Sequence, residues 1–100
     1  MEQHWESLEF DFSGFEWDHE KAKSNRRKHG VGFEEATQIF GSGILARLET
    51  HETEDRYVAI GLVGTKTLVV VFTQRRENIR IISARKATSS ELRRYGAHFA

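Results

Sequence analysis

The segment from Asn78 to Lys86 carries two arginines in a pattern that is typical of a β-strand. Three of its residues are isoleucine, and it contains no glycine or proline. Because side chains alternate along a strand, Arg85 should share one face with Ile79 and Ser83, whereas Arg80 should lie on the other. Guanidinium groups near the end of such a strand can meet an anionic ligand. The alternative is that both arginines are edge charges paired with surface carboxylates.

A second group of basic residues lies at positions 26–29, with the sequence Arg-Arg-Lys-His. It ends a predicted helix that follows Asp18, and Gly30 stands where glycine often terminates a helix. The helix dipole favours positive charge at this end, so a dipole-matched, solvated helix end explains the group. Alternatively, it is a basic patch in which Lys28 and His29 bind a ligand.

Charge is unevenly distributed along the 100 residues, although the formal net charge is zero. The first 20 residues hold seven acidic residues and no lysine or arginine, so the other 80 carry all 15 basic residues against eight acidic ones. A body with this excess of positive charge can attract polyanions. We expect residues 1–12 to be solvated, because charged chain termini are usually loosely held.

The composition excludes several classes of protein. The chain has no cysteine, which excludes a disulfide scaffold, a thiolate zinc site and a cysteine nucleophile. It also has no paired-carboxylate, HExxH or clustered-histidine motif, so we expect no metal or other cofactor. No apolar segment approaches the ~20 residues that span a bilayer, and residues 1–6 do not resemble a signal peptide. We therefore expect a soluble cytoplasmic protein that does not bind membranes.

The elements that position these residues belong to an α+β fold. Helices are predicted at residues 18–28, 33–40 and 88–96. Four successive strands are predicted at residues 44–49, 56–63, 67–73 and 78–86. Short turns join these strands, so they should pair as an antiparallel meander. The third strand is apolar on both faces and should be central.

Weaker signals flank this pattern. Residues 15–17 look like a short strand, and apolar residues at 8, 10 and 12 have strand spacing, so residues 1–13 are either a tail or an edge strand. Thr88 and Glu91 have the spacing of a capping box at the start of the last helix. Gly96 should end that helix and leave residues 97–100 loose.

Four blocks of sequence resemble the BrnT family of toxins. They lie at residues 15–36, 56–61, 68–73 and 79–95. The resemblance implies a toxin of a bacterial type II toxin–antitoxin system with the fold of RelE-like ribonucleases. In that fold, an antiparallel sheet carries two N-terminal helices packed on one face, and a C-terminal helix follows. We expect one such domain at residues 14–100, preceded by an acidic N-terminal extension at residues 1–13 to which the resemblance does not extend.

Membership of this family would imply that the chain is an endoribonuclease that cleaves mRNA and arrests growth. Metal-independent cleavage uses the RNA 2′-hydroxyl as its nucleophile. It needs a proton acceptor, cations for the charge on phosphorus, and a proton donor for the 5′-oxygen. Since the chain lacks a metal-binding motif, we expect basic side chains to perform this chemistry.

We predict a basic cleft on the sheet face opposite the two N-terminal helices. Arg56, Arg80 and Arg85 are candidates to bind the scissile phosphate through their fork of donors. An undistorted strand cannot present both Arg80 and Arg85 to one cleft. Of the two, Arg85 is the stronger candidate.

Other candidates would move protons or contact bases. Lys28 and His29 could transfer protons, although a histidine beside a helix-terminating glycine is often structural. Tyr95 could stack on a base or donate a proton. Alternatively, Tyr95 packs the last helix onto the sheet.

The resemblance also implies partners. The expected ones are an RNA substrate and a cognate BrnA-like antitoxin with a ribbon-helix-helix domain, which alone would contact operator DNA. A homodimer of toxins bridged by antitoxins is a further expectation. The competing hypothesis is a non-catalytic or degenerate toxin that serves as an antitoxin-binding co-repressor module. In that case residues 1–13 could occupy the basic cleft.

Overall fold

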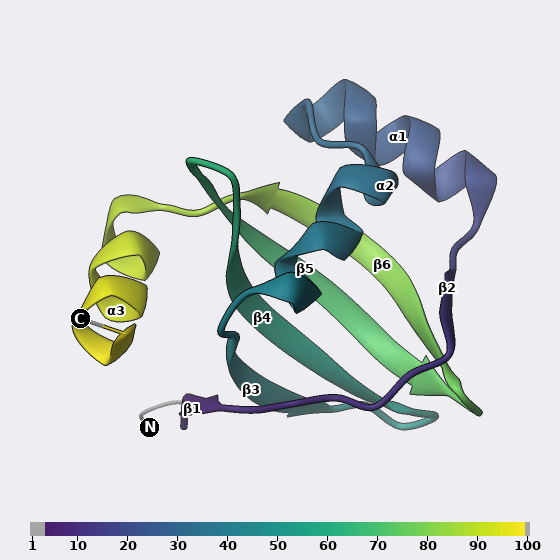
Figure 1. Ribbon diagram of the computed structural model, residues 1–100. Coiled ribbons are helices and arrows are strands. Elements are labelled where there is room, and N and C mark those ends of the chain that lie inside the picture. Colours follow the sequence, from purple (N-terminus) through teal and green to yellow (C-terminus); the bar gives the residue numbers. More distant parts are fainter. Residues whose placement is uncertain (1–3, 100) are drawn as a thin grey trace.

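The structure is a computed structural model that describes residues 4–99 (Figure 1). These residues form one six-stranded sheet and several helices, so the predicted α+β class is confirmed. The strands are β1 (Glu6–Ser7), β2 (Gly14–Glu16), β3 (Leu45–Thr50), β4 (Asp55–Val63), β5 (Lys66–Arg75) and β6 (Asn78–Lys86). The helices are α1 (His19–His29), α2 (Phe33–Ala36), the short 3-10 helix η1 (Thr37–Gly41) and α3 (Ser89–Phe99). No helix among these residues is long and apolar enough to cross a membrane.

The strand order of the sheet is β1-β3-β4-β5-β6-β2, and its pairing is mixed. Strands β3 to β6 pair antiparallel, as the meander predicts, and the apolar β5 lies inside the sheet. The prediction of a wholly antiparallel sheet is wrong at one edge, because β2 runs parallel to β6. Figure 1 shows the cause: the chain leaves β1 at one edge, crosses along the end of the sheet, and enters β2 at the opposite edge.

Local signals set most helix ends. The Asp18 side chain accepts a hydrogen bond from the backbone N–H of Glu20 (2.9 Å), and Gly30 ends α1 with a φ of 71°. The helix predicted at residues 33–40 is instead α2 followed by η1. Gly61 lets this turn approach the sheet closely, because a Cβ at Gly61 would lie 2.7 Å from the Cβ of Ile39.

The last helix differs from its prediction. It continues through Gly96 to Phe99, whereas the sequence predicts an end at Gly96; residue 100 lies outside the described part. The Phe99 ring packs on the Tyr95 ring at a centroid distance of 4.8 Å, and this contact favours the extra turn. A glycine inside a helix costs only about 1 kcal/mol, which such packing can offset.

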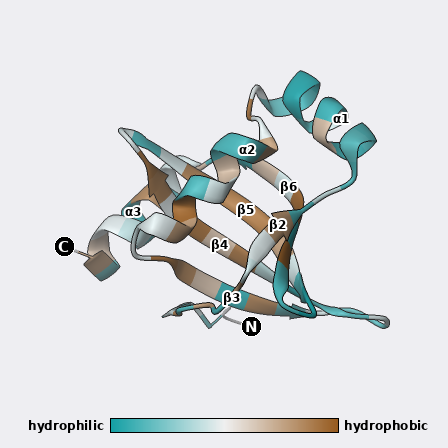
Figure 2. Cartoon of the chain, turned by 45° about the vertical axis from the view of Figure 1, so that its right-hand side comes forward, coloured by the Kyte–Doolittle hydropathy of each residue, from teal (hydrophilic) through white to brown (hydrophobic). Residues whose placement is uncertain are grey.

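Each face of the sheet has its own hydrophobic core. We call one the α1–α2 face, because its core residues, such as Phe72, pack with Phe33 of α2 and Ile39 of η1. We call the other the α3 face, because its core residues, such as Val69, pack with Tyr95 of α3. In Figure 2 the middle strands are hydrophobic, whereas α1 is largely hydrophilic and is held at the margin of the sheet.

The N-terminal segment is packed rather than solvated. Leu8 and Phe10 lie against the core of the α1–α2 face, and the Phe10 ring contacts the rings of Tyr57 (4.9 Å) and Phe72 (5.1 Å). The expectation that residues 1–12 are solvated is therefore wrong for these two apolar residues, while residues 1–3 lie outside the described part. The neighbouring acids Glu9 and Asp11 remain exposed, so these apolar side chains are buried without taking the carboxylates out of water.

A β-bulge in β6 reverses the predicted alternation of its side chains. Val71 pairs with Ser83, but the next residue of β5, Phe72, pairs with Ile81, so Ile82 is the extra residue. Arg80 and Arg85 pair with Thr73 and Val69 and therefore project from the same face, the α3 face. The prediction that Arg80 and Arg85 lie on opposite faces is therefore wrong, because it assumed an undistorted strand.

Candidate functional site

Three arginines predicted to bind phosphate project from the α3 face of the sheet. Arg80 and Arg85 reach this face because of the bulge in β6. Arg56 shares its face of β4 with Val58, a member of the core under α3. The side chains of Arg56, Arg80 and Arg85 are 33%, 27% and 39% exposed, so each is in reach of a ligand while partly covered.

Each of these arginines also meets a carboxylate. The Arg85 Nη1 and Nη2 atoms donate to the two carboxylate oxygens of Glu91 at 2.7 and 2.9 Å. The Arg80 Nη1 atom donates to Glu16 at 2.8 Å. The Nε atom of Arg56 lies 3.5 Å from an oxygen of Glu54. The pairing considered above as the alternative for Arg80 and Arg85 is thus present.

The Arg85–Glu91 pair is the strongest of the three. Hydrogen bonds from Arg85, and then from the backbone N–H of Thr88, lower the pKa of Glu91 from 4.5 to about 2, although burial opposes this shift. The hydrogen bonds to Glu91 also raise the pKa of Arg85, although burial opposes this shift. Glu91 also forms the predicted capping box, accepting from the Thr88 N–H at 2.8 Å, so one carboxylate fixes both the helix start and the arginine.

Arg85 keeps free donors despite this pairing. Among the described residues, it makes two bonds to Glu91 and one to the carbonyl of Lys86. A guanidinium has five N–H groups, so two remain available to a phosphate. Arg85 is therefore held in a fixed position with a usable edge, but its charge is largely compensated by Glu91.

A cleft of about 220 Å³ lies where α1 meets the bulge of β6. Lys28 and His29 line it from the last turn of α1, and Ile82 and Ser83 line it from the bulge. The structure thereby brings together two residues that the sequence predicts for proton transfer with the strand that carries the predicted arginines. Ser83 projects from the same face as Arg85, about 7 Å away along the strand.

The side chain of Asn25 anchors this cleft. Its amide donates to the carbonyl of Ala84 at 2.7 Å and to that of Val31 at 3.1 Å, and its oxygen accepts from the Ala84 N–H at 3.1 Å. Strand β2 pairs with β6 only as far as Arg80, so Asn25 replaces the missing strand at Ala84. The sequence reasoning missed this residue; its signal is a polar side chain one turn after Ala22, on the helix side that packs.

The two cations of the cleft differ from the arginines in their surroundings. Among residues 4–99, no carboxylate forms an ion pair with Lys28 or His29, and both residues are exposed. The cleft therefore presents uncompensated basic groups, which attract anions more strongly than a neutral ion pair does. The described residues contain no cluster of three or more histidine, aspartate or glutamate side chains placed to hold a metal ion.

Tyr95 lies away from this cleft. It is only 7% exposed, it packs in the core of the α3 face, and its hydroxyl donates to the carbonyl of Gly43 at 2.6 Å. This is the position that packs the last helix onto the sheet. A stacked base would have to displace core contacts, so we do not include Tyr95 in the site.

Comparison with known protein families identifies a match. A family model described as the ribonuclease toxin BrnT of type II toxin–antitoxin systems matches residues 17–91, which is three quarters of the chain. No curated protein matches the chain. The matched segment includes α1, the cleft and all three arginines, whereas Tyr95 and residues 1–16 lie outside it.

Proposed function

Because this chain belongs to the family of BrnT ribonuclease toxins of type II toxin–antitoxin systems, we propose that it cleaves mRNA without a metal ion and thereby arrests growth. A toxin of such a system has a protein antitoxin as its partner. We propose that this antitoxin is a BrnA-like ribbon-helix-helix protein that contacts operator DNA and bridges two toxin chains.

The observation that carries this proposal is the cleft between α1 and β6. Its lining includes the imidazole of His29, the ammonium of Lys28 and the hydroxyl of Ser83. Arg85, which Glu91 holds in position, projects from the same face of β6 two residues after Ser83. A phosphodiester fits such a set, because its negative oxygens accept hydrogen bonds and its cleavage requires proton transfer.

The proposed reaction uses groups of the RNA and of this chain alone. His29 accepts the proton of the 2′-hydroxyl, whose oxygen attacks the adjacent phosphorus. The free N–H groups of Arg85 and the Ser83 hydroxyl stabilise the charge that grows on the non-bridging oxygens. Lys28 donates a proton to the departing 5′-oxygen as the P–O5′ bond breaks. The products are a 2′,3′-cyclic phosphate and a 5′-hydroxyl.

The test is cleavage of a synthetic single-stranded mRNA fragment by purified protein in the presence of EDTA. We expect 2′,3′-cyclic phosphate ends from the wild type and strongly reduced cleavage by Arg85→Ala and His29→Ala, with circular dichroism confirming that both fold. Lys23→Gln is the charge control, since Lys23 is exposed on α1 outside the cleft. Loss of activity in EDTA, or full activity of Arg85→Ala, would contradict the mechanism.

The second candidate function is a non-catalytic, antitoxin-binding co-repressor. The pairing of Arg56, Arg80 and Arg85 with carboxylates favours it, because paired arginines bind phosphate less strongly. Expression of the chain without its antitoxin separates the two: growth arrest with RNA fragments supports the nuclease, and normal growth supports the co-repressor. Self-masking by residues 1–13 stays a prediction; residues 4–13 are not among those that line the cleft between α1 and β6.

A further inference from the structure

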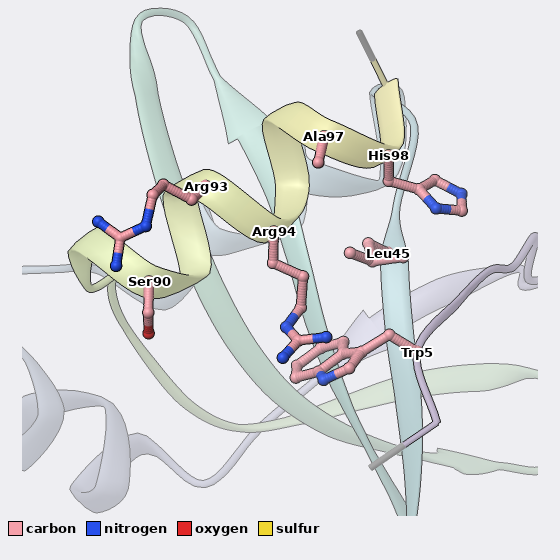
Figure 3. A pocket seen from close by; sticks show the side chains of 7 residues that line it. All are labelled: Trp5, Leu45, Ser90, Arg93, Arg94, Ala97 and His98. Carbon is pink, nitrogen blue, oxygen red and sulfur yellow. The ribbon is translucent and has the colours of Figure 1, made fainter. Parts of the chain in front are cut away.

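We propose that a hollow between α3 and the N-terminal segment is a second subsite that binds a phosphate of the RNA strand. The hollow measures about 530 Å³ and is lined mainly by Trp5, Ser90, Arg93, Arg94 and His98 (Figure 3). This inference deepens the proposed function, because it takes RNA as the substrate. Trp5 and the last turns of α3 lie outside the family match at residues 17–91, so the subsite would be a property of this chain.

The geometry of Arg94 is the first argument. Its guanidinium carbon lies 5.5 Å from the centre of the Trp5 ring, and Figure 3 shows the guanidinium lying across the indole. A cation–π contact uses the face of a guanidinium and leaves its N–H edge free for a phosphate. Trp5 therefore acts as a positioning residue for Arg94.

Trp5 is itself fixed in place. On its ring lies a second guanidinium, that of Arg47, at 5.2 Å. Arg47 is only 16% exposed and pairs with Glu49 at 2.7 Å, so it supports the indole rather than facing solvent. Strand β1 adds Glu6 and Ser7 to the edge of β3, which fixes the backbone beside Trp5.

The charge of the hollow is the second argument. Within residues 4–99, no carboxylate forms an ion pair with Arg93, Arg94 or His98. The sheet arginines Arg56, Arg80 and Arg85, in contrast, are all paired. Ser90, Arg94 and His98 are spaced four residues apart on one face of α3. A hydroxyl, a guanidinium and an imidazole therefore follow one another along the hollow, as the backbone of a nucleic acid strand requires.

The indole favours RNA over an acidic peptide as the ligand. Proteins that bind single strands combine a positive groove with aromatic side chains on which bases stack. Trp5 is half-buried, so part of its ring remains accessible beside the arginines. An acidic peptide would use the charges of the hollow but would gain little from the indole.

The experiment uses the full chain carrying Trp17→Phe, which leaves Trp5 as the sole tryptophan of the two in the sequence. Trp17 packs on Phe33 at a centroid distance of 6.1 Å, away from the hollow, and phenylalanine preserves an aromatic contact. The probe is a single-stranded 2′-O-methyl RNA, which lacks the nucleophile and cannot be cleaved. We expect the fluorescence of Trp5 to change when this RNA binds.

Variants then identify the groups involved. Arg94→Gln should weaken RNA binding about fivefold or more and reduce the slope of log K against log salt by about 1. Lys23→Gln is the control for an exposed charge elsewhere, since Lys23 pairs with Glu20 on α1, which lies apart from α3 (Figure 1), and its loss should have little effect. Trp5→Tyr should retain the slope of the wild type, whereas Trp5→Leu should reduce it, because only an aromatic ring positions Arg94.

Several results would overturn the subsite. One is an Arg94→Gln affinity and salt slope equal to those of the wild type. Another is a polyglutamate peptide that binds at least as tightly as the RNA with the same dependence on Arg94, which would assign the hollow to an acidic protein. RNA cleavage is measured separately. If the wild type cleaves RNA but the binding test fails, only the proposed subsite is refuted. If the wild type does not cleave RNA but the binding test succeeds, only the proposed nuclease activity is refuted.

Discussion

Two groups of cations in this protein have similar chemistry but different surroundings. The paired arginines, Arg56, Arg80 and Arg85, meet carboxylates on the α3 face of the sheet. The cleft cations, Lys28 and His29, line the cleft between α1 and β6, and no carboxylate among the described residues pairs with them. A paired arginine is held in one position with little net charge, whereas an unpaired cation keeps its charge but is loosely held.

The difference suggests a division of labour at the site. The Arg85–Glu91 pair joins the end of β6 to the first turn of α3, so it fixes geometry at the border between sheet and helix. In the proposed reaction Lys28 supplies positive charge and a proton, whereas His29 accepts a proton. Arg85 combines both properties, because Glu91 fixes its position and two of its N–H groups remain free to bind a phosphate. The following predictions test this division.

The largest effect is expected from removing the cleft cations. The double variant Lys28→Gln/His29→Gln should reduce the RNA cleavage rate by about 10²–10⁴, the range typical of lost acid–base catalysis. Its stability should change by less than about 1 kcal/mol, since only helix-dipole interactions are lost. Cleavage rates and urea unfolding of the same preparations check both values.

Arg56→Gln provides the comparison with a paired arginine and should reduce cleavage by less than about tenfold, because its charge is already compensated. Lys23→Gln controls for the loss of surface charge. A larger loss of cleavage in Arg56→Gln than in the cleft double variant would show that the paired arginines carry the chemistry.

The next largest effect concerns the anchor of the cleft. Asn25→Ala removes three hydrogen bonds and leaves the N–H and carbonyl groups of Ala84 without their partner. We expect it to lower the free energy of unfolding by about 1–3 kcal/mol and to reduce cleavage by separating α1 from β6.

Ser24→Ala is the matched control for Asn25, since Ser24 lines the same cleft from the adjacent position of α1. Hydrogen exchange at the Ala84 amide should become faster in Asn25→Ala and stay unchanged in Ser24→Ala. Equal exchange in both variants would mean that Asn25 does not replace a strand partner.

Local patterns were sufficient to predict much of the fold. The apolar run of β5 predicts a central strand, and the spacing of Thr88 and Glu91 predicts the capping box that the structure contains. These signals act between residues that are close in sequence, so one chain reveals them. No local signal predicts the position of β2, because its parallel pairing with β6 depends on the path of residues 8–13 around the sheet (Figure 1).

The candidate site was harder to predict for the same reason. The bulge at Ile82 carries no glycine or proline to signal it, yet it decides that Arg80 and Arg85 share a face. The partner of Arg80, Glu16, lies 64 residues away in sequence, so the compensation of its charge was not visible. The sequence therefore identified candidate cations, but it could not distinguish paired from unpaired ones.

A smaller effect, dependent on pH, should follow from the loss of the Glu91 carboxylate. The pKa of Glu91 is about 2 in the folded protein instead of 4.5, so the charged pair stabilises the fold above about pH 4.5. Glu91→Gln should lower the free energy of unfolding by about 1–2 kcal/mol at pH 7, allowing for solvent screening. This difference from the wild type should shrink as the pH falls from 4.5 towards 2.

Urea unfolding at several pH values measures this difference. Glu52→Gln is the control, because Glu52 is exposed in the loop between β3 and β4 and forms no ion pair with a described residue. Glu91→Gln should also keep more cleavage activity than Arg85→Ala, since Arg85 retains its charge. A pH-independent difference would show that Glu91 stabilises α3 by packing alone.

The smallest effect concerns Arg80 and Glu16. It tests most directly whether pairing with a carboxylate decides how an arginine binds RNA. Glu16→Gln removes the carboxylate partner of Arg80 and leaves an arginine with uncompensated charge on the α3 face. We expect RNA to bind more tightly, by less than about tenfold, with a salt slope increased by at most about 1. The double variant Glu16→Gln/Arg80→Gln should change RNA affinity little, because it removes a pair that is nearly neutral. If this double variant instead weakens binding as much as Lys28→Gln does, a bound phosphate must compete successfully with the carboxylate, and pairing in the free protein would not distinguish structural arginines from functional ones.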